Sequence, residues 1–154
     1  MDKIKVGVIG VGFFGRKHAK IYSQLSEVEL VAIADVNEKR AEKIGQKLDC
    51  KYFTNYQKLL DLKLDAVDIV IPDDLHRKVT LNAIDSDKHI LLEKPLAMNK
   101  EDCEDILEAS RKTDKKFMVA HILRFDPRSL KVKNKIQKEE SSRILFTSCS
   151  LRRF

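Results

Sequence analysis

Residues 6–15 read Val-Gly-Val-Ile-Gly-Val-Gly-Phe-Phe-Gly, and an acidic residue, Asp35, follows twenty residues after the last of these glycines. Apolar residues at 4–9 lead into the glycine turn, and a second apolar run at 28–34 leads directly into Asp35. This order predicts a strand, a tight turn, a helix and a second strand that ends in a carboxylate.

The glycine positions suit the binding of a dinucleotide. Gly10 permits the tight turn off the strand, Gly12 lets a pyrophosphate approach the backbone, and Gly15 lets the helix lie close to the strand. The helix N-terminus would present unpaired N–H groups to the phosphates. Asp35 would hydrogen-bond the adenosine ribose and repel a 2′-phosphate, so NAD is favoured over NADP, a preference that the nearby Arg40 keeps moderate. The simpler interpretation is a plain turn followed by a surface or helix-capping acid.

The composition is that of a globular domain. The chain has 154 residues, of which 43% are hydrophobic, and no apolar run approaches the roughly 18 residues needed to cross a membrane. The N-terminus runs straight into the first expected strand, so no signal peptide is predicted. Three cysteines, Cys50, Cys103 and Cys149, lie far apart without a C-x-x-C pair. They indicate reduced thiols in a cytoplasmic protein rather than a disulfide framework or a metal site.

The net charge is +6, and all of the excess lies in residues 128–154. A nucleic-acid-binding protein would use such a basic tail, but this tail has few aromatic residues to stack on bases and no recognisable binding motif. We therefore expect a solvated helix face followed by a strand, and no nucleic-acid partner.

Short β-branched runs alternate with helical stretches along the chain. Strands are expected at 3–9, 28–34, 51–54, 65–71, 88–92 and 116–121. Helices are expected at 13–25, 38–48, 56–62, 75–86, 99–113 and 127–139, with Asn37, Asn99 and Asp126 as caps of the second, fifth and sixth. This alternation predicts an α/β fold, a doubly wound parallel sheet of the Rossmann type with both faces covered.

The last residues do not fit a completed sheet. Residues 144–147 form one more apolar run after the expected helix at 127–139. We therefore expect a dinucleotide-binding domain at 1–125, and at 126–154 a linker helix and the first strand of an otherwise absent second domain. An unpaired apolar strand is an edge that invites pairing with this domain or with another chain, and a homo-oligomer is one of the arrangements left open.

The segment Leu91-Leu92-Glu93-Lys94-Pro95 ends the fifth expected strand at the edge of the sheet where ligands bind in parallel folds. Lys94 would give or take a proton there if burial and neighbours lowered its pKa. Pro95 restricts Lys94 to an extended backbone and is compatible with a cis bond between the two residues. The alternative is a surface lysine in a turn.

The segment Ile71-Pro72-Asp73-Asp74-Leu75-His76 ends the fourth strand in the same way. One of the two acids is expected to cap the next helix, and His76 lies in its first turn, either as a packed residue or as a cofactor or substrate contact.

Other polar side chains give weaker signals. His18, in the first helix, is more typical of packing than of a ligand, and Arg124, after the sixth strand, either reaches the cofactor or pairs with Asp126. No Ser-His-Asp, Cys-His or metal-ligand spacing is present, so no metal is predicted.

Together these segments resemble the N-terminal domain of the Gfo/Idh/MocA oxidoreductases, the family of glucose–fructose oxidoreductase and inositol dehydrogenase. The matching parts are 10–19, 56–60, 65–72, His76, 88–97 and 124–127, which span nearly the whole chain. Glu93-Lys94-Pro95 is the specific part, because a plain Rossmann domain does not need it.

The resemblance implies a role for each matching residue. In the family, the lysine of the Glu-Lys-Pro element acts on the substrate hydroxyl while hydride passes to or from the nicotinamide, and Lys94 takes that place as the expected catalytic residue. The expected cofactor-binding residues are Gly10, Gly12, Phe13, Phe14, Gly15, Asp35, Val36, Arg40, Ile71, Pro72, Asp73, His76, Glu93, Lys94 and Arg124.

The implied activity is an NAD(P)-dependent transfer of hydride to or from a small-molecule sugar, polyol or similar hydroxy compound. Family members are roughly twice as long, and their second domain supplies the substrate pocket. The alternative is a nucleotide-binding module without independent catalysis, acting as a sensor, a scaffold or a partner-dependent subunit. Asp73 stands where the family often has a small neutral polar residue, and carboxylates here would weaken cofactor binding unless they point away.

Overall fold

The computed structural model describes residues 2–138. It divides into two compact units, Met1–Ala120 and His121–Phe154. The assignment of 126–154 to a second domain stays a prediction, and the strand expected at 144–147 lies outside the described residues.

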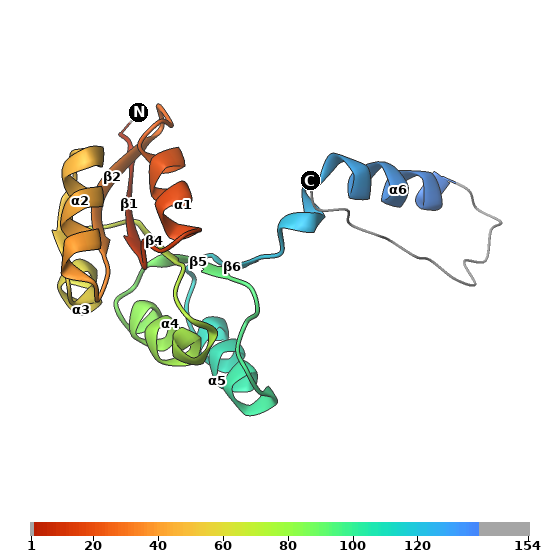
Figure 1. Ribbon diagram of the computed structural model, residues 1–154. Coiled ribbons are helices and arrows are strands. Elements are labelled where there is room, and N and C mark those ends of the chain that lie inside the picture. Colours follow the sequence, from red (N-terminus) through yellow and green to blue (C-terminus); the bar gives the residue numbers. More distant parts are fainter. Residues whose placement is uncertain (1, 139–154) are drawn as a thin grey trace. The chain divides into compact units, whose positions relative to one another are not determined.

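The first unit is built on a six-stranded parallel sheet with the order β3-β2-β1-β4-β5-β6 (Figure 1). The strands are β1 (Ile4–Ile9), β2 (Val28–Ala34), β3 (Lys51–Phe53), β4 (Ala66–Ile69), β5 (His89–Glu93) and β6 (Phe117–Ala120). The order reverses between β1 and β4, and ligands bind at such a switch point in open α/β sheets. The predicted doubly wound parallel sheet is confirmed.

Helices cover both faces of this sheet. They are α1 (Gly15–Tyr22), α2 (Glu38–Leu48), α3 (Tyr56–Leu60), α4 (His76–Asp85) and α5 (Lys100–Arg111). On one face, Val8 and Ile33 are buried with residues of α1 and α2. On the other face, Ile69 and Leu92 are buried with residues of α3 and α4. Neighbouring residues of one strand, such as Val8 and Ile9 on β1, are therefore buried on opposite faces of the sheet, because side chains alternate along a strand.

The glycine turn between β1 and α1 admits no larger residue at two of its positions. Gly10 has a φ of 88°, and a Cβ there would collide with the carbonyl oxygen of Val70 in the segment after β4. A Cβ at Gly15 would collide with the carbonyl oxygen of Gly10. Glycine at these two places lets α1 begin directly against the carboxyl end of β1.

Local capping chemistry sets several helix starts. The side chains of Asn37 and Asn99 accept hydrogen bonds from backbone N–H groups of the first turns of α2 and α5, which confirms both predicted caps.

The expectation that Asp73 or Asp74 caps α4 is wrong. Asp73–Leu75 forms a short 3₁₀ turn, η1, and Leu75 precedes α4 without a side-chain cap. The backbone N–H of Leu75 bonds to the carbonyl of Pro72 at 3.0 Å, so this turn forms the entry to the helix without either carboxylate.

The described part of the second unit contains a 3₁₀ turn, η2 (Ile122–Arg124), and α6 (Pro127–Lys138). Asp126 caps α6 by accepting hydrogen bonds from the backbone N–H groups of Arg128 and Ser129. Its carboxylate also pairs with the Arg128 guanidinium at 2.9 Å. The sequence had left open a pair between Asp126 and Arg124. Arg128 takes that place because the helix cap brings its backbone N–H to the Asp126 carboxylate. Between residues 2 and 138, no helix combines the length and apolar character that crossing a membrane requires.

Candidate functional site

A cavity of about 360 Å³ opens at the carboxyl ends of β1, β2 and β4, at the switch point of the sheet. Seven of the residues predicted to bind a cofactor line it: Gly10, Gly12, Asp35, Val36, Arg40, Ile71 and Pro72. The fold therefore brings together residues from three separate segments of the sequence, which follow β1, β2 and β4.

The glycine turn provides room and hydrogen-bond donors at one side of this cavity. A Cβ placed on Gly12 would meet no atom within 4 Å, so the space beside its backbone is open. No side chain caps α1, and the backbone N–H groups of Arg16 and Lys17 bond to the carbonyls of Gly12 and Phe14, so the donors left for an external acceptor are those of the turn before them. Open space beside a bare backbone at a helix N-terminus fits a pyrophosphate.

Asp35 lies at the end of β2 and is only 7% exposed. Its carboxylate accepts hydrogen bonds from the backbone N–H of Val11 at 3.0 Å and of Asn37 at 2.9 Å. The Arg40 guanidinium donates two more, Nε to Oδ2 at 2.9 Å and Nη2 to Oδ1 at 2.7 Å. Burial raises the pKa of Asp35, but these hydrogen bonds outweigh it and hold the pKa below its ordinary value of 3.8.

Sequence reasoning missed several residues that line the same cavity. Thr54 and Tyr56 follow the carboxyl end of β3, while Leu75 and Lys78 lie at the start of α4. Tyr56 is fixed by a hydrogen bond that its hydroxyl accepts from the Asn82 side chain at 2.8 Å. A signal existed for these residues, because the carboxyl end of β3 belongs to the same edge of the sheet as the glycine turn.

Phe13 and Phe14, also predicted to bind the cofactor, do not line the cavity. Their side chains are 59% and 58% exposed, and the two rings meet edge to face with centroids 5.2 Å apart. The Lys17 ammonium lies 4.2 Å from the centre of the Phe13 ring, an attractive cation–π distance. The exposed aromatic pair therefore holds the positive charge of Lys17 beside the glycine turn.

His76 is completely buried and does not line the cavity. Its Nδ1 lies 2.7 Å from the carbonyl oxygen of Pro95, and its Nε2 lies 3.1 Å from that of Ile71. The ring thus ties the loop after β4 to the loop after β5. Of the two roles that the sequence left open, the structure gives His76 the packed one.

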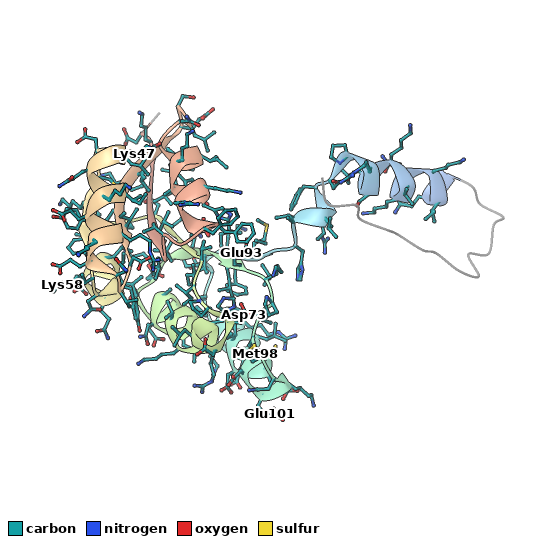
Figure 2. All side chains as sticks on the ribbon, in the orientation of Figure 1. Lys47, Lys58, Asp73, Glu93, Met98 and Glu101 are labelled. Carbon is teal, nitrogen blue, oxygen red and sulfur yellow. The ribbon has the colours of Figure 1, made fainter. Side chains whose placement is uncertain are left out.

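Glu93 and Lys94 lie at the carboxyl end of β5. The Lys94–Pro95 peptide bond is cis, and the Glu93 Oε2 accepts a hydrogen bond from the backbone N–H of Lys94 at 2.9 Å. Lys94 is exposed, so the described residues do not provide the burial that the sequence analysis required for it. Figure 2 labels Glu93 and also Asp73, which is exposed in the turn before α4 and does not line the cavity.

Gly15 and Arg124 complete the predicted set. Gly15 is buried under the turn, where it allows the close approach of α1. Arg124 ends η2 in the second unit. Among the described residues, no group of three His, Cys, Asp or Glu side chains is arranged to hold a metal ion.

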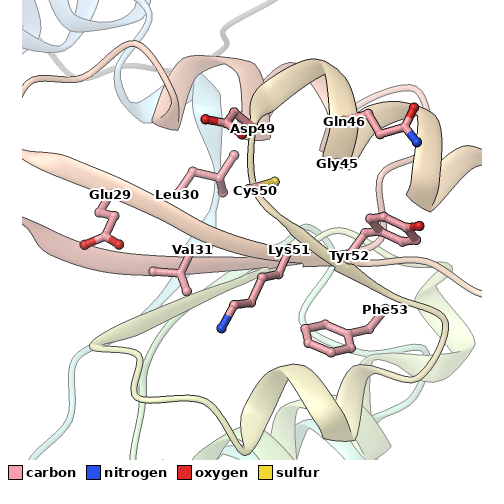
Figure 3. A pocket seen from close by; sticks show the side chains of 10 residues that line it. All are labelled: Glu29, Leu30, Val31, Gly45, Gln46, Asp49, Cys50, Lys51, Tyr52 and Phe53. Carbon is pink, nitrogen blue, oxygen red and sulfur yellow. The ribbon is translucent and has the colours of Figure 1, made fainter.

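A second, more open depression of about 750 Å³ lies against β2, β3 and the end of α2. Figure 3 shows its lining, which includes Glu29, Asp49, Cys50 and Tyr52. Burial raises the pKa of the Cys50 thiol to about 11, so this cysteine is not an activated nucleophile. The depression lies at the outer strand of the sheet, away from the switch point between β1 and β4, and we assign it no ligand.

The family profile described as "Oxidoreductase family, NAD-binding Rossmann fold" matches residues 4–121. The chain belongs to this family, Gfo/Idh/MocA. The matched residues include the six-stranded parallel sheet, the glycine turn and the Glu-Lys-Pro element at the end of β5.

Three similar proteins illustrate the range of this Gfo/Idh/MocA family. The 2,7-anhydro-N-acetylneuraminate hydratase of Escherichia coli K12 is 32% identical over 123 residues, 79% of this chain and 32% of that protein. The inositol 2-dehydrogenase of Salmonella typhimurium LT2 is 30% identical over 142 residues, 89% of this chain and 42% of that protein. The crystal structure of an NAD binding oxidoreductase from Klebsiella pneumoniae superposes with a TM-score of 0.79 at 32% identity and covers 88% of this chain and 39% of that one. The chain thus spans less than half the length of each.

Proposed function

We propose that this chain is the nucleotide-binding part of a dehydrogenase that transfers hydride between NAD and a hydroxyl group of a sugar, a polyol or a similar compound. The observation that carries the proposal is the pairing of open space at Gly12, beside the uncapped start of α1, with the buried carboxylate of Asp35 in the same cavity. These are the two anchors that a dinucleotide needs, one for its pyrophosphate and one for its adenosine ribose.

The cofactor that fits Asp35 best is NAD. Because the backbone N–H groups of Val11 and Asn37 fix the carboxylate, it stays charged and in place to accept the two ribose hydroxyls. A 2′-phosphate would meet that same negative charge. Arg40 moderates the preference, since its guanidinium pairs with the Asp35 carboxylate and its side chain is 45% exposed, where an incoming phosphate could contact it.

Lys94 is the residue that we propose for proton transfer. A bound nicotinamide would supply or accept hydride, and the Lys94 amine would accept or return the proton of the substrate hydroxyl. Its place at the carboxyl end of β5 and its backbone hydrogen bond to Glu93 support this role. Lys94 is exposed, so the remainder of a longer protein is proposed to cover it and to choose the substrate.

The names of the similar proteins support a carbohydrate-like substrate. One acts on inositol and another on an anhydro sugar acid, both of which carry several hydroxyl groups. A second candidate, a nucleotide-binding module without its own catalysis, is favoured by one observation: the described residues leave Lys94 exposed.

Three further predictions belong to this proposal. We expect the protein to act in the cytoplasm, to bind no nucleic acid and to self-associate through its last residues. The lysines at 131, 133 and 135 on α6 are exposed, but so are Leu130, Val132 and Ile136, so their exposure does not single out one solvated face of the helix.

A hydride-transfer assay separates the enzyme from the binding module. The chain is mixed with NAD and a panel of polyols and sugars, and the appearance of reduced nicotinamide is followed by absorbance. Turnover that disappears in Lys94→Ala, and is kept in the exposed control Lys47→Ala on α2, supports the enzyme. NADH binding without turnover on any compound supports the module, and the absence of both refutes the proposal.

A further inference from the structure

Asp68 is a buried acid in the centre of the sheet that the proposed function does not use. It lies on β4 between Val67 and Ile69, both of which enter the core beneath α3 and α4. Because side chains alternate along a strand, Asp68 faces the opposite side, toward α1. It is 1% exposed, and its Oδ2 lies 2.8 Å from Nδ1 of His18 on α1.

The second ring nitrogen of His18 faces another carboxylate. Its Nε2 lies 3.8 Å from Oε1 of Glu93, whose side chain is 15% exposed at the end of β5. A neutral imidazole carries one N–H and can donate to only one of these acids. A protonated ring donates toward both, so the placement of two carboxylates on opposite sides of one ring favours the imidazolium.

Glu93 carries this contact to the proposed catalytic lysine. One of its oxygens faces His18, and the other accepts the backbone N–H of Lys94 at 2.9 Å. Two hydrogen bonds, His18 to Asp68 and Lys94 to Glu93, are thus joined by one longer ion-pair contact of 3.8 Å between His18 and Glu93.

The charges that act on His18 come from two strands only. The hydrogen bond to Asp68 is the main reason that the pKa of His18 is raised above 6.5; burial opposes it, and the charges of Asp68 and Glu93 add to it. Tyr22, one turn later on α1, stays neutral because burial and the nearby Asp68 raise its pKa. Within the described residues, β1, β2 and α2, which also pack against α1, place no ion pair on this ring.

We propose that His18 is a positioning residue for Lys94: as an imidazolium it holds the Glu93 carboxylate, which in turn holds the backbone of Lys94. Loss of the His18 proton then releases Glu93 and loosens the segment that carries the lysine. The importance of this link for catalysis rests on the proposed function, whereas the link itself is a property of the folded chain.

Nuclear magnetic resonance of the full 154-residue chain tests the link directly. The His18 ring and the Lys94 backbone amide are followed from about pH 5 to about pH 9, the range in which histidines titrate. We expect the Lys94 amide shift to change with the same midpoint as the His18 ring. A Lys94 amide that stays constant while His18 titrates would overturn the proposal.

Three variants identify the path of the effect. In Glu93→Gln the His18 ring should still titrate while the Lys94 amide no longer follows it, and in His18→Gln the amide should stay constant. In Asp68→Asn both midpoints should fall together, because the hydrogen-bonded negative charge that raises the His18 pKa is lost. The control His89→Gln, at the opposite end of β5, should leave the coupling unchanged. A Lys94 amide that titrates equally in His18→Gln would show that His18 acts only as a structural partner of Asp68.

The same samples are titrated with NADH, which distinguishes the two proposals. Absent NADH binding with intact coupling of the two midpoints would refute the proposed function alone. Normal NADH binding with a constant Lys94 amide would refute the positioning role alone.

Discussion

The Arg40 guanidinium forms a bidentate pair with the Asp35 carboxylate through two hydrogen bonds, Nε to Oδ2 at 2.9 Å and Nη2 to Oδ1 at 2.7 Å. Together with the backbone N–H groups of Val11 and Asn37, four donors reach one carboxylate, which offers about four acceptor positions. A ribose that bonds to Asp35 must therefore displace the guanidinium. Under the proposed function, we therefore expect Arg40 as well as Asp35 to affect the choice of cofactor.

Replacing Asp35 with serine should weaken NADH binding and reduce the preference for NADH over NADPH. A hydrogen bond to a charged group contributes about 1.5–3 kcal/mol, so we expect a loss of about tenfold or more in NADH affinity. Fluorescence titration of both coenzymes against the wild type and Asp35→Ser measures the change. Equal NADH affinity in the two proteins would show that Asp35 does not hold the ribose.

Replacing Arg40 with glutamine should act mainly on NADPH. The variant lacks the cation that a 2′-phosphate would contact, while Asp35 keeps the two backbone donors that fix it. We expect NADPH affinity to fall by about tenfold and NADH affinity to fall less or to rise. Arg77→Gln, on the opposite side of α4 toward α5, is a matched control, because its side chain pairs with Asp105 outside the cavity. A parallel loss of both coenzymes in Arg40→Gln would count against this role.

Ile69 tests the core that supports the site. It lies on β4 and is completely buried, so Ile69→Ala should lower the free energy of unfolding by about 2–5 kcal/mol. Urea unfolding followed by circular dichroism measures the change. The control Ile21→Ala removes the same atoms from a side chain that is 54% exposed on α1, and we expect a change within about 0.5 kcal/mol. Similar losses in both variants would contradict the assigned burial.

His18 should make stability depend on pH. Because its pKa is raised in the folded chain, its contribution is complete below the unfolded value of 6.5 and is lost as the pH rises through the folded pKa. The difference in free energy of unfolding between the wild type and His18→Gln should therefore be larger at about pH 6 than at about pH 9. Urea unfolding at the two pH values measures it. An equal difference at both would mean that the ring does not exchange its proton in this range.

Much of the fold could be predicted because the relevant signals are local. Apolar runs located the strands, and the amides of Asn37 and Asn99 located two helix starts. The entry to α4 could not be predicted in this way, because a backbone hydrogen bond at Leu75 performs the task that a side chain of Asp73 or Asp74 was expected to perform.

The part of the candidate site that one continuous segment of sequence forms could be predicted. The open space at Gly12 and the buried acid at Asp35 follow from the spacing of the first βαβ unit. The contact between His18 and Asp68 joins residues fifty positions apart, and no pattern in either segment indicates the other. The alternation of side chains along β4 offers one signal. Asp68 stands between Val67 and Ile69, so its side chain faces the side of the sheet opposite to theirs.

The most direct test of the account is the binding of NADH to the wild-type chain and to Gly12→Val. A side chain at Gly12 would meet no atom of the folded chain within 4 Å at its Cβ, so the variant should fold with a nearly unchanged melting temperature. The new side chain would occupy the space proposed for the pyrophosphate. We predict saturable NADH binding by the wild type and at least about tenfold weaker binding by Gly12→Val. Equal affinities in the two proteins, or no binding by the wild type, would contradict the claim that a dinucleotide lies against this turn.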